Sequence, residues 1–572
     1  MDDRLRELFE SATTSVGVES ANGCGLALVA VGGYGRSELS PASDVDVVLL
    51  HDPAFADDDV SAVAQRIWYP LWDDGVLLDH AVRGAQAMHE AADVDIRTAT
   101  GMLDARAVAG DAWLVQSLRS GVLGSWRRHA RDRLPQLRAA CDERVERAGW
   151  LAHAAVPDLK NSGGGLRDGV VMRALVSTWL IDVPRHETEP LRRALLDVRD
   201  ALHEATGRRT DRLSGDLLPD VAELLELTPA ELDMHVRGLG WRTAHLAQLA
   251  WRRIGAVLHP RSRRRRSPTG PKIERLDTGI GLLEGDVVFT RDAKPRVDGN
   301  LALRAAAAAA NGGHILSPRV AARCAEDDAA APPTPWSDST RELMVELLAS
   351  GRDLISVWEE LDIAGVVDRW LPEWSTIRLR GSSSPVHMYT IDRHSLQTVV
   401  NASHLVRRVR RPDLLVVAAL MHDIGKPATR RFEDGGVVTF RFHETVGAKM
   451  AAKRMKALTF DKDTTKKVAR LVELHLRFHG YVDSPWTDSA VRRYVTDAGD
   501  LLQHLHRLTR ADVTTRNRRK ARTLARAYDE LEARIDHLAE QEEIAKIRPD
   551  LDGNRIMEIL ELPPGRVVGE AY

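Results

Sequence analysis

The sequence has few cysteines, no long apolar run and almost no net charge, and each shortage excludes a class of protein. Three cysteines, Cys24, Cys141 and Cys324, lie far apart without the spacing of a metal or redox motif, which predicts a cytoplasmic, reducing location. No apolar run reaches the ~18 residues of a membrane span, and the start, Met-Asp-Asp-Arg, lacks the layout of a signal peptide. The net charge of −3 argues against a protein that coats nucleic acid.

Residues 29–50 carry the strongest chemical signal in the chain. A short apolar run breaks at Gly32-Gly33, and a second apolar run begins around Asp44 and Asp46. Alternation along a strand places both carboxylates on one face, where their repulsion favours a bound cation such as Mg²⁺ with nucleotide phosphates. The glycines let backbone N–H groups approach a triphosphate at a helix start. An ordinary glycine turn with solvated acids is the alternative; the combination favours a nucleotidyl-transfer site.

Residues 32–50, GGYGRSELSPASDVDVVLL, resemble the signature of the bifunctional protein-PII uridylyltransferase/uridylyl-removing family, which belongs to the polymerase-β-like superfamily. The resemblance implies that Asp44 and Asp46 are catalytic Mg²⁺ ligands. It also implies a nucleotide-binding set: Gly32, Gly33, Arg36 and Ser43. Such a domain carries a third carboxylate on a later strand, and Asp79, in a predicted strand over 75–83, is the best-placed candidate. A strand-end acid that faces water is the alternative for Asp79.

A second glycine-rich stretch lies at 156–168. Three glycines between Lys160 and Arg167 predict a flexible loop flanked by two cations, which suits a phosphate. A plain interdomain turn is the alternative. The stretch is similar to one near the nucleotide in the same family, which implies that Lys160 and Arg167 bind nucleotide and that Asp168 supports them.

A second chemical centre follows the apolar helix predicted to end in His422-Asp423. The ordered set that accompanies this pair is His394, His443, His475 and Asp512. Imidazole and carboxylate ligands suit Mn, Fe, Zn or, less well, Mg, and such a metal activates water for hydrolysis. Each histidine alone is more often a core or surface residue, but the set resembles the HD-domain phosphohydrolases, with His422 and Asp423 catalytic. His479, one turn after His475, is a candidate for phosphate binding.

The chain departs from the PII-modifying family in two places. After His422-Asp423 it inserts residues 427–442, which predict a β-hairpin, and residues 426–572 look more like bacterial tRNA nucleotidyltransferases that carry an HD domain. The family also ends in two ACT domains that sense glutamine, and we expect none in the residues after Asp512. Glutamine control of the usual kind is therefore in doubt.

These signals predict a multidomain, mostly α protein. The predicted parts are a small α/β polymerase-β-like nucleotidyltransferase domain (1–110), a helical nucleotidyltransferase-associated domain (111–260), a linker with a small β/α segment (261–337), an all-α HD domain (338–530) and a helical tail (531–572).

The leading functional hypothesis is nucleotidylation of a tyrosine on the PII signalling protein, with hydrolytic removal by the HD domain and no membrane partner. UTP is the donor in the family, and related enzymes use ATP. The alternative is a tRNA 3′-end (CCA-type) nucleotidyltransferase, suggested by residues 426–572 and the arginine-rich stretches 261–266 and 516–526. Against it, the Arg-Arg-Asp-Phe-Thr-Ile-Asn-Ala type of segment is missing. A third hypothesis keeps only the HD domain active.

Overall fold

The computed structural model of the chain describes residues 1–18, 23–259, 272–326, 329, 331–332, 334–381, 389–432, 438–478, 480–481, 486–513, 518–546, 553–561 and 563. His479 and the basic stretch 261–266 lie outside these residues. Two compact units are present: residues 1–394 with 431–439, and residues 395–430 with 440–572. The five-part division predicted from the sequence is finer than this and stays a prediction.

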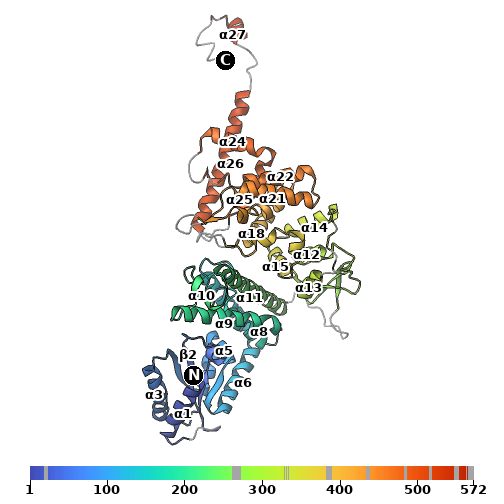
Figure 1. Cartoon of the computed structure of the whole chain (residues 1–572). Helices are drawn as coiled ribbons and strands as arrows, with labels where there is room; N and C mark the ends of the chain where they lie inside the picture. Colours follow the sequence, from blue (N-terminus) through green and yellow to red (C-terminus); the bar gives the residue numbers. More distant parts are fainter. Residues whose placement is uncertain are drawn as a thin grey trace. The chain divides into compact units, whose positions relative to one another are not determined.

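A four-stranded mixed sheet forms the N-terminal part of the first unit. In Figure 1 the label β2 marks one of its strands. The strands are β1 (Leu26–Ala30), β2 (Val45–His51), β3 (Leu78–Gly84) and β4 (Arg106–Gly110), in the order β3-β2-β1-β4. β1 pairs antiparallel with β2 and β4, whereas β2 pairs parallel with β3. The strand, glycine turn and strand predicted for residues 29–50 are confirmed, with a one-turn helix α2 (Gly32–Gly35) at the glycines.

Both faces of this sheet are buried, because alternate residues of β1 and β2 enter two different cores. Leu28 and Leu49 pack with α1 (Asp2–Thr14) and α3 (Asp57–Asp73). Val29 and Val48 pack into a second core with helices on the opposite face. These helices are α4 (Ala85–Val94), α5 (Ile96–Leu103), α6 (Ala112–Arg128), α7 (Ala130–Ala148) and α8 (Leu166–Ser177). Asp46 shares its face with Val48 and therefore lies on the side of α4–α8.

The remaining helices of the middle region pack around α8. They are α9 (Arg185–Thr206), α10 (Leu218–Leu224) and α11 (Pro229–Leu258). α9 ends because Gly207 adopts a left-handed conformation, φ 60°. α11 begins with a capping box in which Thr228 and Glu231 satisfy each other's backbone N–H groups. Leu195, Leu202, Leu232 and Val236 belong to the core between α9 and α11.

A second small sheet, with the order β5-β6-β7-β8, follows in the same unit. Its strands are β5 (Glu274–Asp277), β6 (Ile280–Leu283), β7 (Asp286–Phe289) and β8 (Ile315–Leu316). β6 and β7 form an antiparallel hairpin, and the alanine-rich helix of this part ends at Gly312. The helices of this part are α12 (Leu301–Gly312), α13 (Pro318–Ala325), α14 (Asp338–Leu348), α15 (Leu354–Ile363), α16 (Val367–Trp370) and α17 (Trp374–Ile377).

The second unit is helical. Its elements are α18 (Ile391–Ser403), which enters from the first unit, η1 (Val406–Arg408), α19 (Pro412–Met421), α20 (Lys426–Thr429), α21 (His443–Ala457), α22 (Lys462–Leu474), α24 (Asp488–Ala498), η2 (Gly499–Leu501), α25 (Leu502–Ala511), α26 (Arg518–Lys546) and α27 (Gly553–Leu560). The inserted segment contains the antiparallel strands β9 (Arg431–Phe432) and β10 (Val438–Thr439). The multidomain, mostly α class is confirmed. Among the described helices, none has the length and hydropathy of a membrane span.

Candidate functional site

Three carboxylates meet at one end of the N-terminal sheet. Asp46 on β2 stands in register with Asp79 on the parallel strand β3. Ligand oxygens of Asp44, Asp46 and Asp79 all lie within 4.8 Å of one another. One detail of the sequence interpretation is wrong: β2 begins at Val45, so Asp44 precedes the strand rather than lying on it. The structure therefore brings the two motif acids together with the third acid that the resemblance implied.

The closeness of these three carboxylates affects the pKa of Asp46. Burial, and then the negative charges of Asp44 and Asp79, raise the pKa of Asp46 to about 6. Two cations act in the opposite direction, Lys160 and Arg209. Arg209 donates from Nη1 to Asp44 Oδ2 at 2.9 Å, in a partly exposed ion pair. The site thus holds more negative charge than its own cations neutralise.

Gly32 leaves the space that Asp46 occupies. Its φ of +57° lies in the left-handed region, and a Cβ atom at this position would lie 2.7 Å from Asp46 Oδ2. Only glycine combines this backbone conformation with so close an approach. The glycine of the motif is therefore needed to seat the carboxylate, in addition to any contact with a phosphate.

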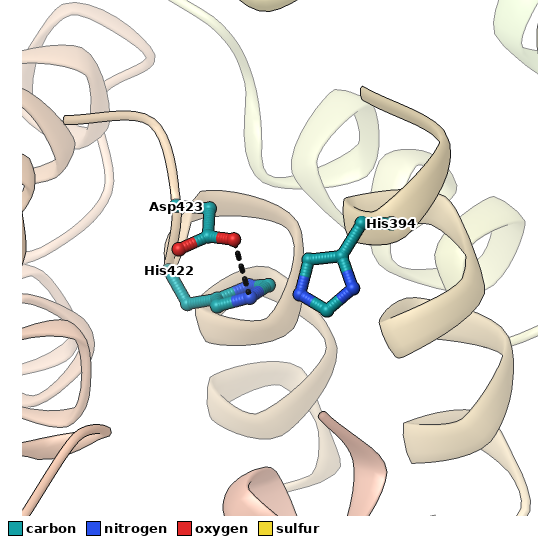
Figure 2. A group of neighbouring side chains, drawn as sticks. All are labelled: His394, His422 and Asp423. Atoms are coloured by element: carbon teal, nitrogen blue, oxygen red, sulfur yellow. Dashed lines mark ion pairs between the residues drawn. The ribbon is translucent and has the colours of Figure 1, made fainter. Parts of the chain in front are cut away.

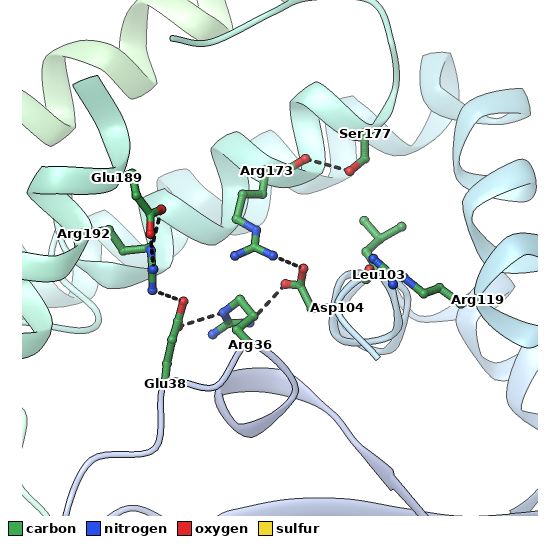
Figure 3. Close-up of polar contacts among 9 residues, drawn as sticks. All are labelled: Arg36, Glu38, Leu103, Asp104, Arg119, Arg173, Ser177, Glu189 and Arg192. Atoms are coloured by element: carbon green, nitrogen blue, oxygen red, sulfur yellow. Dashed lines mark hydrogen bonds and ion pairs between the residues drawn. The ribbon is translucent and has the colours of Figure 1, made fainter. Parts of the chain in front are cut away.

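The other predicted nucleotide-binding residues of the motif lie on the glycine turn, at Gly33 and Arg36, and in the loop that follows it, at Ser43. A Cβ atom at Gly33 would have no neighbour closer than 3.9 Å. Ser43 precedes Asp44, and its buried Oγ has no hydrogen-bond partner among the described residues. Arg36 donates to Glu38 Oε2 at 2.8 Å and to Asp104 Oδ2 at 3.3 Å (Figure 3). Arg36 therefore ties the turn to Asp104, and its contact with nucleotide stays a prediction.

The glycine-rich loop is packed, so the prediction of a flexible loop is wrong. Gly164, at φ +88°, lies so close to α11 that a Cβ atom would stand 2.1 Å from the carbonyl oxygen of Gly240. Asp168 is buried, forms an ion pair with Arg144, and accepts a 2.6 Å hydrogen bond from the amide of Gly164. Asp168 therefore holds the loop in place.

Of the two loop cations, Lys160 lies nearer to the carboxylates. Burial lowers the pKa of Lys160, and the charges of Asp211 and Asp44 act on it in the opposite direction. Burial also lowers the pKa of Arg167, the second residue of α8. Since the charge of Lys160 is felt at both Asp44 and Asp46, Lys160 remains our candidate for contact with a nucleotide phosphate, and Arg167 stays a prediction.

Sequence reasoning missed one set of contacts beside the carboxylates. α9 and the segment after it contact every second residue of the loop that leads to Asp44. Arg192 pairs with Glu38 (Figure 3). Arg199 Nη1 donates to Ser40 Oγ at 2.9 Å, and the amide of Ala42 donates to His203 Nδ1 at 3.3 Å. Arg209 completes the series at Asp44. No local motif in the sequence signals these partners.

A second group of side chains that could bind a metal ion lies where α18, α19, α21 and α22 meet. Ligand atoms of His394, His422 and Asp423 lie within 4.8 Å of one another, as do those of Asp423, His443 and His475. Figure 2 shows the first of these groups, with the ring of His394 on α18 facing the His422-Asp423 pair. Asp512 joins them, because its Oδ1 lies 3.3 Å from His422 Nε2. All six predicted residues are thus brought together.

Hydrogen bonds orient three of the histidine rings. The Nδ1 atoms of His422, His443 and His475 lie 2.8, 2.8 and 2.6 Å from the backbone carbonyls of Ala419, Phe440 and Val472. Within the described part of the chain, Nε2 of His443 and Nε2 of His475 have no hydrogen-bond partner although both are buried. A neutral imidazole with Nδ1–H on a carbonyl presents Nε2 to a metal. These two Nε2 atoms, which both lie near Asp423 Oδ1, therefore fit a metal site.

Strong electrostatic coupling surrounds Asp423. Its Oδ1 lies 3.3 Å from His443 Nε2, and its Oδ2 accepts from Lys426 Nζ at 2.6 Å. Although burial raises the pKa of Asp423, the charges of His422 and Lys426 hold it well below its usual range. Burial lowers the pKa of His475 to about 3, so this ring is neutral and ready to act as a ligand. Lys426 was not among the predicted site residues.

Both centres lie in regions of the chain that are similar to known proteins. Residues 391–517 match the family model for the HD domain. A bifunctional uridylyltransferase/uridylyl-removing enzyme of Streptomyces coelicolor is 44% identical, over 85% of this chain and 59% of that protein. Enzymes of the same name from Mycobacterium tuberculosis and Corynebacterium glutamicum are 36% and 32% identical, over 86% and 79% of this chain. The matches cover 61% and 62% of the length of these two enzymes, so the chain spans about three fifths of the length of its relatives.

Proposed function

Because the chain is similar over most of its length to bifunctional uridylyltransferase/uridylyl-removing enzymes, we propose that it carries both activities. The first centre transfers a nucleotidyl group, UMP from UTP, to a tyrosine of the PII signalling protein. The HD centre removes that group by hydrolysis. The observation that carries the proposal is the presence of two separate sets of metal-binding side chains in one chain, Asp44 with Asp46 and Asp79, and the group around Asp423.

The carboxylate group fits Mg²⁺, which prefers oxygen ligands. Mg²⁺ bound there would neutralise phosphate charge that develops during transfer. Asp44, Asp46 and Asp79 would hold the ion. Ser43, with its buried hydroxyl, and Lys160 would orient the donor, and the narrow turn at Gly32 would let its phosphates approach the backbone.

The HD group fits a divalent metal with affinity for imidazole, such as Mn or Fe, and Mg less well. A metal there would lower the pKa of bound water and so supply a nucleophile for hydrolysis. His394, His422, His443, His475, Asp423 and Asp512 would hold it. Carbonyl oxygens fix three of the rings, and Lys426 fixes the Asp423 carboxylate, so the ligands need little rearrangement to bind.

The test is transfer of label from UTP or ATP that carries radioactive phosphorus at the α-phosphate, with PII protein and tRNA offered as acceptors. We expect label on PII, abolished by Asp44→Asn combined with Asp46→Asn, and released on longer incubation unless His422→Ala is present. Label on tRNA would overturn the proposal in favour of a tRNA-modifying enzyme. Absence of label on both acceptors would leave hydrolysis by the HD centre as the one remaining activity of the proposal.

A further inference from the structure

Arg209 is the described cation in direct contact with the carboxylate group of the first centre. Its Nη1 lies 2.9 Å from Asp44 Oδ2, and Asp44 is 165 residues away in the chain. The side chain of Arg209 is 48% exposed and that of Asp44 is 23% exposed. An ion pair with this much solvent contributes little to stability. The pair can therefore open at small cost when another charged group arrives.

The backbone around Arg209 is fixed even though its side chain is exposed. The segment after α9 pairs antiparallel with the loop that carries Lys160, through the bridge between Asp158 and Arg212. The amide of Leu159 donates to the carbonyl of Asp211 at 2.7 Å, and the amide of Leu213 donates to the carbonyl of Pro157 at 2.9 Å. Lys160 and the segment of Arg209 are thus held by the same pairing.

A buried side-chain link strengthens this arrangement. Arg199 on α9 donates from Nε to Asp211 Oδ1 at 2.6 Å and from Nη1 to Ser40 Oγ at 2.9 Å. It therefore joins the segment of Arg209 to the loop that ends at Asp44. Two cations, Lys160 and Arg209, consequently act on Asp46 from segments that are paired with each other, and the hydroxyl of Ser43, next to Asp44 in the chain, has no hydrogen-bond partner within the described part of the chain.

Given the proposed transferase, we propose that Arg209 is a ligand for the triphosphate of the donor nucleotide and exchanges Asp44 for phosphate when the donor binds. The inference rests on the proposed function and names a residue for the same site. An Mg²⁺ ion and Arg209 compete for Asp44, since both are cations. A triphosphate removes the competition because guanidinium N–H groups bind phosphate oxygens in a bidentate fork, which frees the carboxylate for the metal.

The test measures binding to the whole chain without turnover. Mn²⁺ affinity is measured without nucleotide, and the affinity for a non-transferable UTP analogue with Mg²⁺ is measured by calorimetry, with the corresponding ATP analogue in parallel. The Asp46→Asn variant serves as the reference for Mn²⁺ that binds elsewhere in the chain. We expect Arg209→Gln to weaken triphosphate binding by about 10-fold or more, the value of a charge-assisted hydrogen bond. The same variant binds Mn²⁺ as tightly as wild type or more tightly.

Two further variants separate this role from a structural one. Arg208→Gln removes the exposed neighbouring cation and leaves both affinities unchanged. Arg209→Lys keeps the charge without the fork and loses less triphosphate affinity than Arg209→Gln. Wild-type triphosphate affinity in Arg209→Gln would overturn the inference, as would a parallel loss of Mn²⁺ and triphosphate. A wild-type chain that binds Mn²⁺ but no triphosphate would instead overturn the transferase function itself.

Discussion

Asp46 and Asp79 stand opposite each other in register on parallel strands β2 and β3, so their carboxylates are forced together by the sheet itself. Backbone pairing leaves neither side chain free to move away along its strand. The strands thus store a repulsion that a bound cation relieves. Removal of one of these charges should therefore damage activity and benefit stability at the same time.

Asp46→Asn should lower nucleotidyl transfer by at least about 100-fold and leave HD-dependent hydrolysis intact. In chelator, the same variant should resist denaturation better than wild type at neutral pH. The folded pKa of Asp46, about 6, exceeds its ordinary value of 3.8. Ionisation therefore costs the folded state stability as pH rises from about 4 to about 6, and the cost persists above that range. Urea denaturation at pH near 4 and near 8 measures this.

The stability advantage of Asp46→Asn should be present near pH 8 and small near pH 4, because the folded-state carboxyl is then protonated and that of the unfolded chain is only about half ionised. An advantage of equal size at both pH values would show that the effect has a cause other than carboxylate repulsion.

Gly32→Ala should abolish transfer and lower the melting temperature. The new Cβ would stand 2.7 Å from Asp46 Oδ2 in a backbone conformation of φ +57°, and such strain costs about 1–3 kcal/mol. Gly33→Ala is the matched control, because its Cβ has no neighbour within 3.9 Å. Thermal unfolding measures the melting temperatures of both variants and tests this prediction. Equal melting temperatures for the two would contradict the close approach of Gly32 to Asp46.

His475→Ala should remove metal from the HD centre and stop removal of the nucleotide, while transfer by the first centre continues. The reason is that the buried Nε2 of His475 lies 3.8 Å from Asp423 Oδ1 and has no hydrogen-bond partner among the described residues. Metal content by mass spectrometry and release of label from modified PII measure the two effects. His504→Gln alters a buried histidine whose Nε2 faces the carbonyl of Arg411, so it should retain metal. Full metal content in His475→Ala would exclude this residue as a ligand.

His245→Gln should destabilise the first unit by roughly 3 kcal/mol near neutral pH, because it leaves a buried carboxylate without its partner. His245 Nε2 lies 2.7 Å from Glu360 Oε2, and its Nδ1 lies 3.7 Å from Glu359. Burial lowers the pKa of His245, but the two glutamates outweigh it and raise the pKa to about 9.

The raised pKa of His245 fixes the pH dependence of this effect. The stabilisation is fully present below pH 6.5 and is lost as pH rises through about 9. The difference between wild type and His245→Gln should therefore shrink at alkaline pH in urea denaturation. His235→Gln, on the exposed side of the same helix, is the control. A constant difference across this range would argue against a charged His245.

Local signals predicted the first centre well. The spacing of Gly32, Asp44 and Asp46 follows from strand and turn geometry within a short segment, and the structure places Asp79 beside them. The HD residues also lie on or next to helices. His422-Asp423, His475 and Asp512 follow α19, α22 and α25, whereas His394 and His443 lie in the first turns of α18 and α21. In both cases the structure brings the candidate residues together through regular elements.

Long-range packing could not be read in this way. Arg209 meets Asp44 across 165 residues, and nothing near Arg209 marks it. The three glycines before Arg167 suggested a flexible loop, whereas Gly164 fits against the backbone of α11. Whether a glycine provides freedom or close packing depends on the partner element, which the local sequence does not specify. The two-residue strand β8 is too short to show a pattern.

α9 and the segment after it contact every second residue of the loop before Asp44. These contacts restrict how this part of the chain can evolve. Glu38, Ser40, Ala42 and Asp44 each meet a partner on or just after α9. One residue inserted within the loop would shift the residues after it by one position and replace these partners with their neighbours. Length is therefore constrained here as well as side-chain identity. A single-residue deletion should be less tolerated than substitution of the exposed intervening residue Pro41.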